Sequence, residues 1–358
     1  MADVVVIGGG IAGVSAAAYL AQSMDVILLE AEPVLAYHTT GRSAALYYPG
    51  YGHSSVGPLS EVSGDFFRNP EFTDHALLSP RGVLTVEVGE QRANVPVGTA
   101  RRLNRSELRQ LLPAFGESVH GGVWEPDPMD VDVAATHQAF VRMFWAAGGV
   151  IHRLSRVRAL RRDGELWRVD HGDTYTEAPV VVNAAGAWAD QIAGLAGIAP
   201  VGLIPKRRTA FMIVAPPQSQ EWPLTHDVDS SFYFKPDGEQ LMCSLADETP
   251  SDPCDAQPRE LDVSLAIERI NLVTTFGIRS VQSQWAGLRT FAPDGGMVIG
   301  AAPEADGFYW LAGQGGTGIQ TAPAAGQLTA SLVKGEGVPD DLVKAGFDLS
   351  QMSSDRFT

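Results

Sequence analysis

The chain has 358 residues, of which 45% are hydrophobic and 19% are charged, a composition typical of a globular protein rather than a disordered one. Its formal net charge of −16 disfavours nucleic acid and anionic membranes as partners, because both are bound through clustered Lys and Arg. The two cysteines, Cys243 and Cys254, predict neither a disulfide framework nor a metal site, and they suit a reducing cytoplasm. The sequence starts without a basic leader and has no apolar run of about 18 residues, so we expect a cytoplasmic protein without a transmembrane segment.

The first thirty residues predict a strand, a helix and a second strand in close succession. The apolar run from Val4 to Ile7 is typical of a buried parallel strand, and the alanine-rich stretch from Ile11 to Ser23 is typical of a helix. A second strand is expected from Asp25 to Leu29. A G-x-G-x-x-G frame lies between the first strand and the helix, which indicates a dinucleotide site.

Each residue type in this frame has a physical role in holding a dinucleotide. Gly8 permits a tight turn, Gly10 lets the backbone approach a pyrophosphate, and Gly13 lets the helix pack closely on the strand. The helix N-terminus offers free N–H groups to the phosphates. Glu30 can accept both ribose hydroxyls of an adenosine, and an acid at this position disfavours a 2′-phosphate. A glycine turn without a ligand is the alternative.

The later part of the chain favours FAD over NAD. An NAD-binding protein would continue with alternating strands and helices, whereas residues 36–52 have the composition of a loop. A strand-turn-helix pattern returns at Val180 to Val182, followed by Gly186, and again at Phe308 to Ala312, where glycines precede a helix from about Thr321. A second glycine-rich turn far along the chain suggests a long cofactor held at both ends, with the second helix N-terminus at the pyrimidine edge of a flavin. An ordinary glycine-rich loop remains the alternative.

Seven motifs give the chain a resemblance to a family of flavoproteins. In chain order they are VIGGGIAG, YHTTGRSAA, VVNAAGAWAD, IPKRRTAF, SFYFKPD, WAGLRTFAPDG and GQGGTGIQT. Together they resemble the D-amino-acid oxidase superfamily of FAD-dependent oxidoreductases, and most closely bacterial FAD-dependent D-arginine dehydrogenase, over essentially the whole chain. The resemblance implies an α/β protein with an α+β second part. It has a Rossmann-type FAD-binding domain (residues 1–79, 129–199 and 292–358) interleaved with an antiparallel-sheet substrate domain (80–128 and 200–291).

The resemblance also implies which residues contact the flavin. In the family, the HTTGRSA segment wraps the cofactor, and members that bind flavin covalently use a cysteine near the AGLR segment. Residues 285–291 contain no cysteine, so FAD is expected to bind without a covalent link. The expected cofactor-binding residues are Gly8, Gly10, Ile11, Ala12, Gly13, Glu30, Thr39, Thr40, Arg42, Ser43, Ala44, Gly186, Gly315, Gly316, Thr317, Gly318 and Ile319.

The segment IPKRRTAF places Arg207 and Arg208 side by side at the start of an apolar strand. Neighbouring strand side chains point to opposite faces, so at most one of them can enter a site on a given face. Periodicity leaves both possible, and the resemblance selects Arg208, so that Arg207→Met is expected to have little effect. Arg289, before a Pro-Asp-Gly turn, is the second candidate. Two guanidinium groups suit a substrate carboxylate in a dry pocket, and surface ion pairs are the alternative for each.

Two tyrosines complete the expected carboxylate site. Tyr233 lies on a strand that leads into a Pro-Asp-Gly turn, where its hydroxyl could donate to the carboxylate. Tyr51 lies in a glycine-flanked loop and resembles the family's mobile active-site tyrosine. A place in the apolar core is the alternative for both rings. Lys235 is expected to end a strand in solvent rather than to act as a base.

The expected side-chain pocket is apolar. D-Arginine dehydrogenases place a glutamate just after the LLSPR segment and a histidine upstream, whereas this chain has Val83 and Leu46 at the matching positions. A cationic side chain would be desolvated there without compensation, which predicts a preference for neutral, apolar D-amino acids. Glu87 is the counter-argument, since it shares a strand face with Val83 and could reach back into the pocket.

These features predict the oxidative deamination of D-amino acids to 2-oxo acids and ammonia via an imine, by hydride transfer from Cα to flavin N5. The electron acceptor stays open between oxygen and a quinone-like molecule. A glycine- or sarcosine-type oxidase is the nearest alternative among enzymes. A flavin-holding module without turnover is the alternative from another class, and the paired arginines and tyrosines disfavour it.

Overall fold

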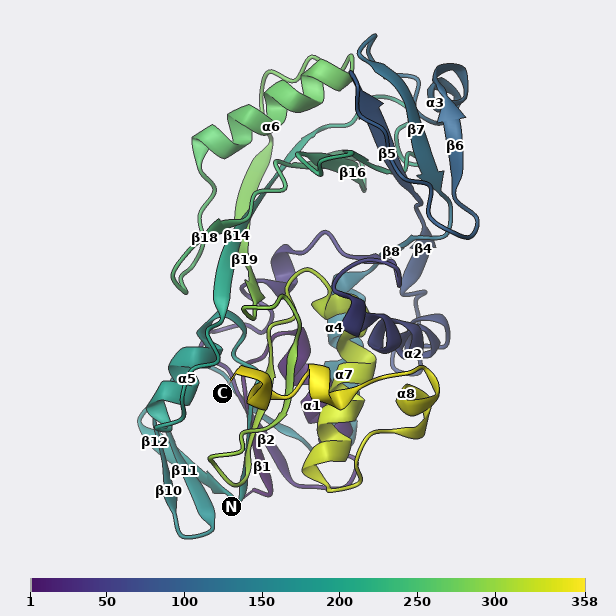
Figure 1. Cartoon of the computed structure of the whole chain (residues 1–358). Coiled ribbons are helices and arrows are strands. Elements are labelled where there is room, and N and C mark those ends of the chain that lie inside the picture. Colours follow the sequence, from purple (N-terminus) through teal and green to yellow (C-terminus); the bar gives the residue numbers. More distant parts are fainter. Residues whose placement is uncertain (1, 358) are drawn as a thin grey trace.

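The computed structural model describes residues 2–357, and its lower half in Figure 1 is built on a six-stranded sheet. The strands lie in the order β20 (Val298–Ala301), β21 (Phe308–Ala312), β13 (Val180–Asn183), β1 (Val4–Ile7), β2 (Val26–Leu29) and β9 (Val150–His152). All neighbours are parallel except β20 and β21. This is the Rossmann-type sheet that the N-terminal motif predicts, and the mixed α/β class is confirmed.

Both faces of the six-stranded sheet are covered, which explains why the central strands β1 and β2 are apolar at every position. Val4 and Val6 of β1 face a layer of helices, and Val5 and Ile7 face the opposite layer. The helices of the first layer are α1 (Ile11–Leu20), α4 (Val133–Ala146) and α7 (Gly318–Val333). The second layer contains β10 (Val157–Asp163), β11 (Leu166–His171), β12 (Thr174–Ala178) and α5 (Ala189–Leu195).

A nine-stranded sheet forms the upper half of the molecule in Figure 1. Its main order is β18 (Thr249–Pro250), β14 (Ile204–Val214), β17 (Gln240–Ser244), β16 (Tyr233–Asp237), β15 (Leu224–Asp227), β5 (Val83–Val88), β7 (Val119–Glu125) and β6 (Arg101–Asn104), and β19 (Ser283–Phe291) also pairs with β14. All pairs are antiparallel except β5 with β15. Its outer face packs on α6 (Glu260–Val273) and α3 (Arg105–Leu111), and its inner face turns towards the six-stranded sheet. Its strands come from residues 83–125 and 204–291, so we retain the two-domain division of the chain as a proposal.

A small sheet of β3 (Leu46–Tyr47), β8 (Met129–Val131) and β4 (Leu78–Pro80) lies between the two large ones, close to α2 (Gly57–Arg68), which in turn contacts α8 (Asp340–Lys344). Asp130 of β8 crosses to the nine-stranded sheet, where one oxygen is 2.6 Å from Lys235 Nζ and the other is 2.6 Å from Arg81 Nε. Lys235 is only 6% exposed, so the expectation that it ends a strand in solvent is wrong. The ion pair with Asp130 provides the compensation that a buried ammonium requires.

Two helix boundaries differ from the sequence-based expectation. The first helix ends at Leu20 rather than Ser23, because the chain tightens there into a turn in which Ser23 N–H donates to Leu20 O. The last long helix begins at Gly318 rather than near Thr321, so Gly318 belongs to its first turn. Among residues 2–357, no helix combines the length and apolarity needed to cross a bilayer.

Candidate active site

An elongated cavity of about 340 Å³ runs between the six-stranded sheet and the inner face of the nine-stranded sheet. On one side its wall includes Gly8 and Glu30, which follow β1 and β2. On the other side the wall includes Arg208 of β14, Tyr233 of β16 and Arg289 of β19. The carboxyl ends of parallel strands are the usual ligand site of an open α/β sheet, and here they face a second sheet that carries cationic groups.

The first glycine turn divides into positions that the fold needs and one position that a ligand can use. A Cβ on Gly13 would stand 1.8 Å from Gly8 O, and a Cβ on Gly8, whose φ is +110°, would stand 2.5 Å from Ala184 O. A Cβ on Gly10 would meet nothing closer than Thr40 Oγ1 at 3.2 Å. Gly8 and Gly13 therefore permit the packing of strand and helix, whereas Gly10 leaves open space before the helix N-terminus.

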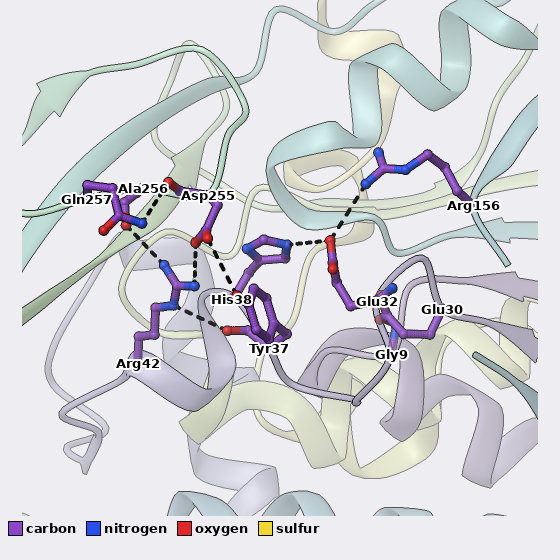
Figure 2. Close-up of polar contacts among 10 residues, drawn as sticks. All are labelled: Gly9, Glu30, Glu32, Tyr37, His38, Arg42, Arg156, Asp255, Ala256 and Gln257. Carbon is purple, nitrogen blue, oxygen red and sulfur yellow. Dashed lines mark hydrogen bonds and ion pairs between the residues drawn. The ribbon is translucent and has the colours of Figure 1, made fainter. Parts of the chain in front are cut away.

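Glu30 is held rigidly at the edge of this cavity (Figure 2). Its Oε2 accepts from Gly9 N–H at 2.7 Å, and its Oε1 accepts from Glu32 N–H at 2.8 Å. Each carboxylate oxygen keeps further acceptor capacity, so the two oxygens can still receive the hydroxyls of a ribose. Thr40 Oγ1 accepts from Ile11 N–H at 3.0 Å, which fastens the HTTGRSA segment to the start of α1.

Arg42 lines the cavity, but its guanidinium is committed to the protein (Figure 2). Its Nη1 donates to Ala286 O at 2.7 Å and to Ala256 O at 3.1 Å, and its Nη2 pairs with Asp255. Thr39 Oγ1 donates to Leu288 O at 2.7 Å. The segment therefore wraps the cavity by bonding to β19 and the loop before α6, with Ser43 and Ala44 in the wall beside it.

The second glycine turn brings Gly315, Gly316, Gly318 and Ile319 into the wall, and Gly186 and Ala12 line it elsewhere. Thr317, which we expected to contact the cofactor, does not line the cavity. Its side chain donates back to Gln314 O at 3.0 Å and is buried within the turn. The turn brings its glycines to the cavity and directs the side chain of Thr317 away from it, into the protein interior.

Arg208 and Arg289 form a cationic end of the cavity. Burial lowers the pKa of Arg208 from its usual value, and the neighbouring Arg289 lowers it further. Arg208 Nη2 lies 3.1 Å from Glu248, and its Nε donates to Asp247 O at 2.8 Å. Among residues 2–357, no carboxylate lies within 4.0 Å of the Arg289 guanidinium. Glu248 also pairs with Lys206, so this half-exposed acid does not compensate both arginines, and the excess positive charge at this end of the cavity favours the binding of an anion.

Arg207 lies on the opposite face of β14, where α6 packs. It is 5% exposed, its Nη2 is 2.9 Å from Asp262 of α6, and its Nε is 3.5 Å from Asp247. The alternation of strand side chains thus separates the two arginines as expected, but Arg207 is a buried ion-pair partner. This location agrees with the expectation that Arg207 does not face the site, and the small expected effect of its replacement on catalysis stays a prediction.

The two candidate tyrosines lie close to these cations. Tyr233 lines the cavity, whereas Tyr51 is 48% exposed in the loop after β3 and does not form part of the wall. A Cβ on Gly316 would stand 3.0 Å from Arg289 Nη1 and 3.5 Å from the Tyr51 hydroxyl. Both groups therefore approach the same glycine at the start of α7.

The residues predicted for the side-chain pocket lie outside the cavity wall. Val83 is 2% exposed on β5, and Leu46 is half-buried beside Asp130. Glu87 cannot reach back as supposed, because it accepts from Ala93 N–H at 2.9 Å and pairs with Arg102. Burial would raise the pKa of Glu87, but the Ala93 N–H and Arg102 outweigh it and hold that pKa below its usual range.

Three polar residues near this region were not predicted from the sequence, namely Tyr48, Glu125 and His226. Glu125 lies directly across from Val83 in the sheet and accepts from the Tyr48 hydroxyl at 2.6 Å. His226 lies directly across from Tyr233, and its Nδ1–H donates to Asp227 O at 2.8 Å. Burial lowers the pKa of His226, which keeps its imidazole neutral.

The family model of FAD dependent oxidoreductases matches residues 3–332. The chain belongs to this family. It is 25% identical to the glycine oxidase of Bacillus licheniformis, with 96% of each chain covered, and 26% identical to the mitochondrial sarcosine dehydrogenase of Mus musculus over 93% of this chain. It spans only 39% of that sarcosine dehydrogenase. The crystal structure of glycine oxidase from Geobacillus kaustophilus has the same fold, with a TM-score of 0.84, 21% identity and 98% of each chain covered.

The cavity fits the FAD that this family requires. The open space at Gly10, the helix N-terminus behind it and the fixed Glu30 carboxylate suit the pyrophosphate and ribose of a dinucleotide. Cys243 is buried in the core of the nine-stranded sheet and Cys254 is exposed, and neither lines the cavity. Noncovalent binding stays a prediction. Among residues 2–357, no cluster of His, Cys, Asp or Glu could hold a metal ion.

The variant Gly10→Val is expected to fold but to purify without flavin. Its side chain would enter the space in front of the helix N-terminus, where the nearest atom to the added Cβ is Thr40 Oγ1 at 3.2 Å, so the fold can accommodate the side chain while a pyrophosphate loses its space. The flavin absorbance per mole of protein, measured alongside far-UV circular dichroism, checks this expectation. A yellow, fully loaded Gly10→Val protein would contradict the assignment of the site.

Proposed function

We propose that this FAD-dependent oxidoreductase oxidises D-amino acids with neutral, apolar side chains to 2-oxo acids and ammonia. The observation that carries the proposal is the pair Arg208 and Arg289 at one end of the cofactor cavity, with the Tyr233 hydroxyl beside them. Partly buried guanidinium groups with too few acids to neutralise them are suited to bind a carboxylate.

FAD, when bound, supplies a two-electron oxidant that can accept a hydride from the substrate Cα. The protein's part is orientation. Arg208 and Arg289 would hold the carboxylate through directional N–H bonds, and Tyr233 and Tyr51 would each add one O–H donor. Fixing the carboxylate restricts the position of the adjacent Cα, which is how positioning lowers the barrier of such a reaction.

The names of the relatives support amino-acid oxidation and favour a second candidate, a glycine- or sarcosine-type oxidase. The chemistry at Cα would be the same, and the difference lies in the side-chain space and the electron acceptor. The carboxylate site disfavours a flavin-holding module without turnover, because a cofactor holder needs no such site. We keep oxygen and a quinone-like molecule as the candidate acceptors, and the low cysteine content supports a cytoplasmic location.

The preference for apolar side chains is inferred from Val83 and Leu46 in the sequence, although neither lines the cavity, and from the pairing of Glu87 with Arg102. Arg102 and the Ala93 N–H satisfy the Glu87 carboxylate, so it offers no charge to a cationic substrate. The Glu125 carboxylate, opposite Val83, accepts from the Tyr48 hydroxyl. A guanidinium or ammonium placed beside Val83 would lose its hydration without gaining a free carboxylate as a partner.

Anaerobic mixing with D- and L-amino acids, glycine and sarcosine tests the proposal, since a substrate bleaches the yellow flavin. We expect D-Met, D-Leu and D-Phe to exceed D-Arg by at least about tenfold in kcat/KM, equivalent to about 1.4 kcal/mol. Glycine or sarcosine as the best substrate would favour the second candidate. D-Arg as the best substrate would refute the argument from Val83 and assign the recognition of the cation to Glu125.

A further inference from the structure

The loop that carries Tyr51 is fastened to the nine-stranded sheet by one hydrogen bond. Tyr48 follows β3, and its hydroxyl donates to Oε2 of Glu125, the last residue of β7, at 2.6 Å. Burial, followed by the hydrogen bond to Glu125, raises the pKa of Tyr48, so this hydroxyl keeps its proton at working pH. A bond from a hydroxyl to a carboxylate is charge-assisted and is stronger than a neutral one.

The same loop is fastened to α7 through Gln320, which is 3% exposed. Its Oε1 accepts from Tyr48 N–H at 2.8 Å, and its Nε2 donates to Tyr51 O at 3.3 Å. Tyr51 N–H donates to Tyr48 O at 2.9 Å, which closes the turn between them. Because Gly318 and Ile319 of α7 line the cavity, this turn is tied to the helix that borders the cofactor.

The ring of Tyr51 contacts the ring of Tyr48. The two rings are stacked with their centroids 6.1 Å apart and their planes 19° apart. Tyr51 is half exposed, and no hydrogen bond of its hydroxyl is recorded among residues 2–357. A ring with so little of its own support depends on the orientation of the ring on which it stacks. That second ring is oriented by Glu125.

We propose that Tyr48, Glu125 and Gln320 are positioning residues that hold Tyr51 at the cationic end of the cavity. In this proposal the Tyr48–Glu125 bond acts as a latch between the loop and the nine-stranded sheet. The proposal rests on the role suggested above for Tyr51 as a donor to the substrate carboxylate. The latch orders Tyr51 before the substrate arrives, so that binding does not have to order it. Loss of the latch raises the dissociation constant of a carboxylate ligand without weakening the hold on FAD.

Tyr48→Phe tests the latch, because it removes the hydroxyl and keeps the stacked ring. We expect the dissociation constant of the FAD-loaded protein for benzoate, read from the flavin absorbance, to rise about tenfold, as for the loss of one charge-assisted hydrogen bond. Hydrogen–deuterium exchange over residues 49–56 should quicken, and the dissociation constant for FAD should stay unchanged. Tyr47→Phe is the matched control, since the Tyr47 hydroxyl donates to Ser60 O and not to Glu125. It should leave benzoate binding and exchange in the loop unaltered.

Repeating the Tyr48→Phe measurement in the Tyr51→Phe variant separates a positioning role of Tyr48 from a direct or a general structural role. If Tyr48 acts through Tyr51, Tyr48→Phe has no further effect on benzoate binding once Tyr51→Phe is present. A tenfold loss that persists in that background overturns the proposal, as does unchanged loop exchange in Tyr48→Phe. Glu125→Gln, which keeps an acceptor oxygen, should lose less than Glu125→Leu. Benzoate binding and exchange need no turnover, so a protein that oxidises no amino acid but shows these effects refutes the proposed function alone.

Discussion

Replacing Arg289 with Met is expected to lower kcat/KM for the best amino acid by roughly 3–5 kcal/mol, as for truncating one member of a desolvated charge pair. Among residues 2–357, no acid pairs with Arg289, so its full charge is available to a substrate carboxylate. Its removal also leaves that carboxylate facing Arg208, whose guanidinium is partly committed to Glu248 and to Asp247 O. Most of the loss should appear as a higher KM.

Lys206→Met is the matched control for this variant. Lys206 lies directly across from Arg289 in the strand pair β14–β19 and carries the same charge, but it pairs with Glu248 and does not line the cavity. Steady-state kinetics on both variants, with flavin content measured in each, separates a local role from a general loss of positive charge. Equal losses in the two variants would show that only the overall field matters.

Local patterns were sufficient for the parts of the fold that are determined within a few residues. The strand Val4–Ile7 and the glycines after it were predictable because burial on both faces and a Cβ-free turn leave a direct mark on the residue types. The alternation of β14 likewise separated Arg207 from Arg208 without any knowledge of their partners. Which face met the cavity depended on where α6 packs, and that is decided far along the chain.

Long-range register accounts for most of what was missed. Glu125 gains its place opposite Val83 only through the pairing of β5 with β7, and no spacing in the sequence states that pairing. Lys235 was placed in solvent because its partner, Asp130, belongs to a different sheet. The same cause underlies the error on Glu87, whose charge is matched by Arg102 on a neighbouring strand pair. The environment of a side chain whose partner lies on a distant strand cannot be predicted from the pattern of its own strand.

Arg207→Met is expected to cost about 3–5 kcal/mol of folding free energy, since it removes a buried cation from between a buried carboxylate, Asp247, and a partly buried one, Asp262. Asp247 and Asp262 would both remain, with Asp262 on α6 and Asp247 beside the edge of β14. Asp247 also accepts from Thr209 N–H at 2.6 Å, so its carboxylate cannot turn to solvent without breaking this hydrogen bond to β14. The mutation should therefore loosen α6 from the sheet.

Arg208→Met, one residue later, makes the same chemical change with the opposite expected result. Arg208 pairs with the half-exposed Glu248 and is repelled by Arg289, so its loss should change stability little and reduce kcat/KM strongly. Urea unfolding of the two FAD-loaded variants gives a free energy of unfolding for each. Kinetics at a temperature where both are folded gives a kcat/KM for each. Arg207→Met should lose stability and retain a nearly normal KM, because its side chain never faces the cavity. If Arg207→Met unfolded like the wild type and lost activity instead, the assignment of the two faces of β14 would have to be reversed.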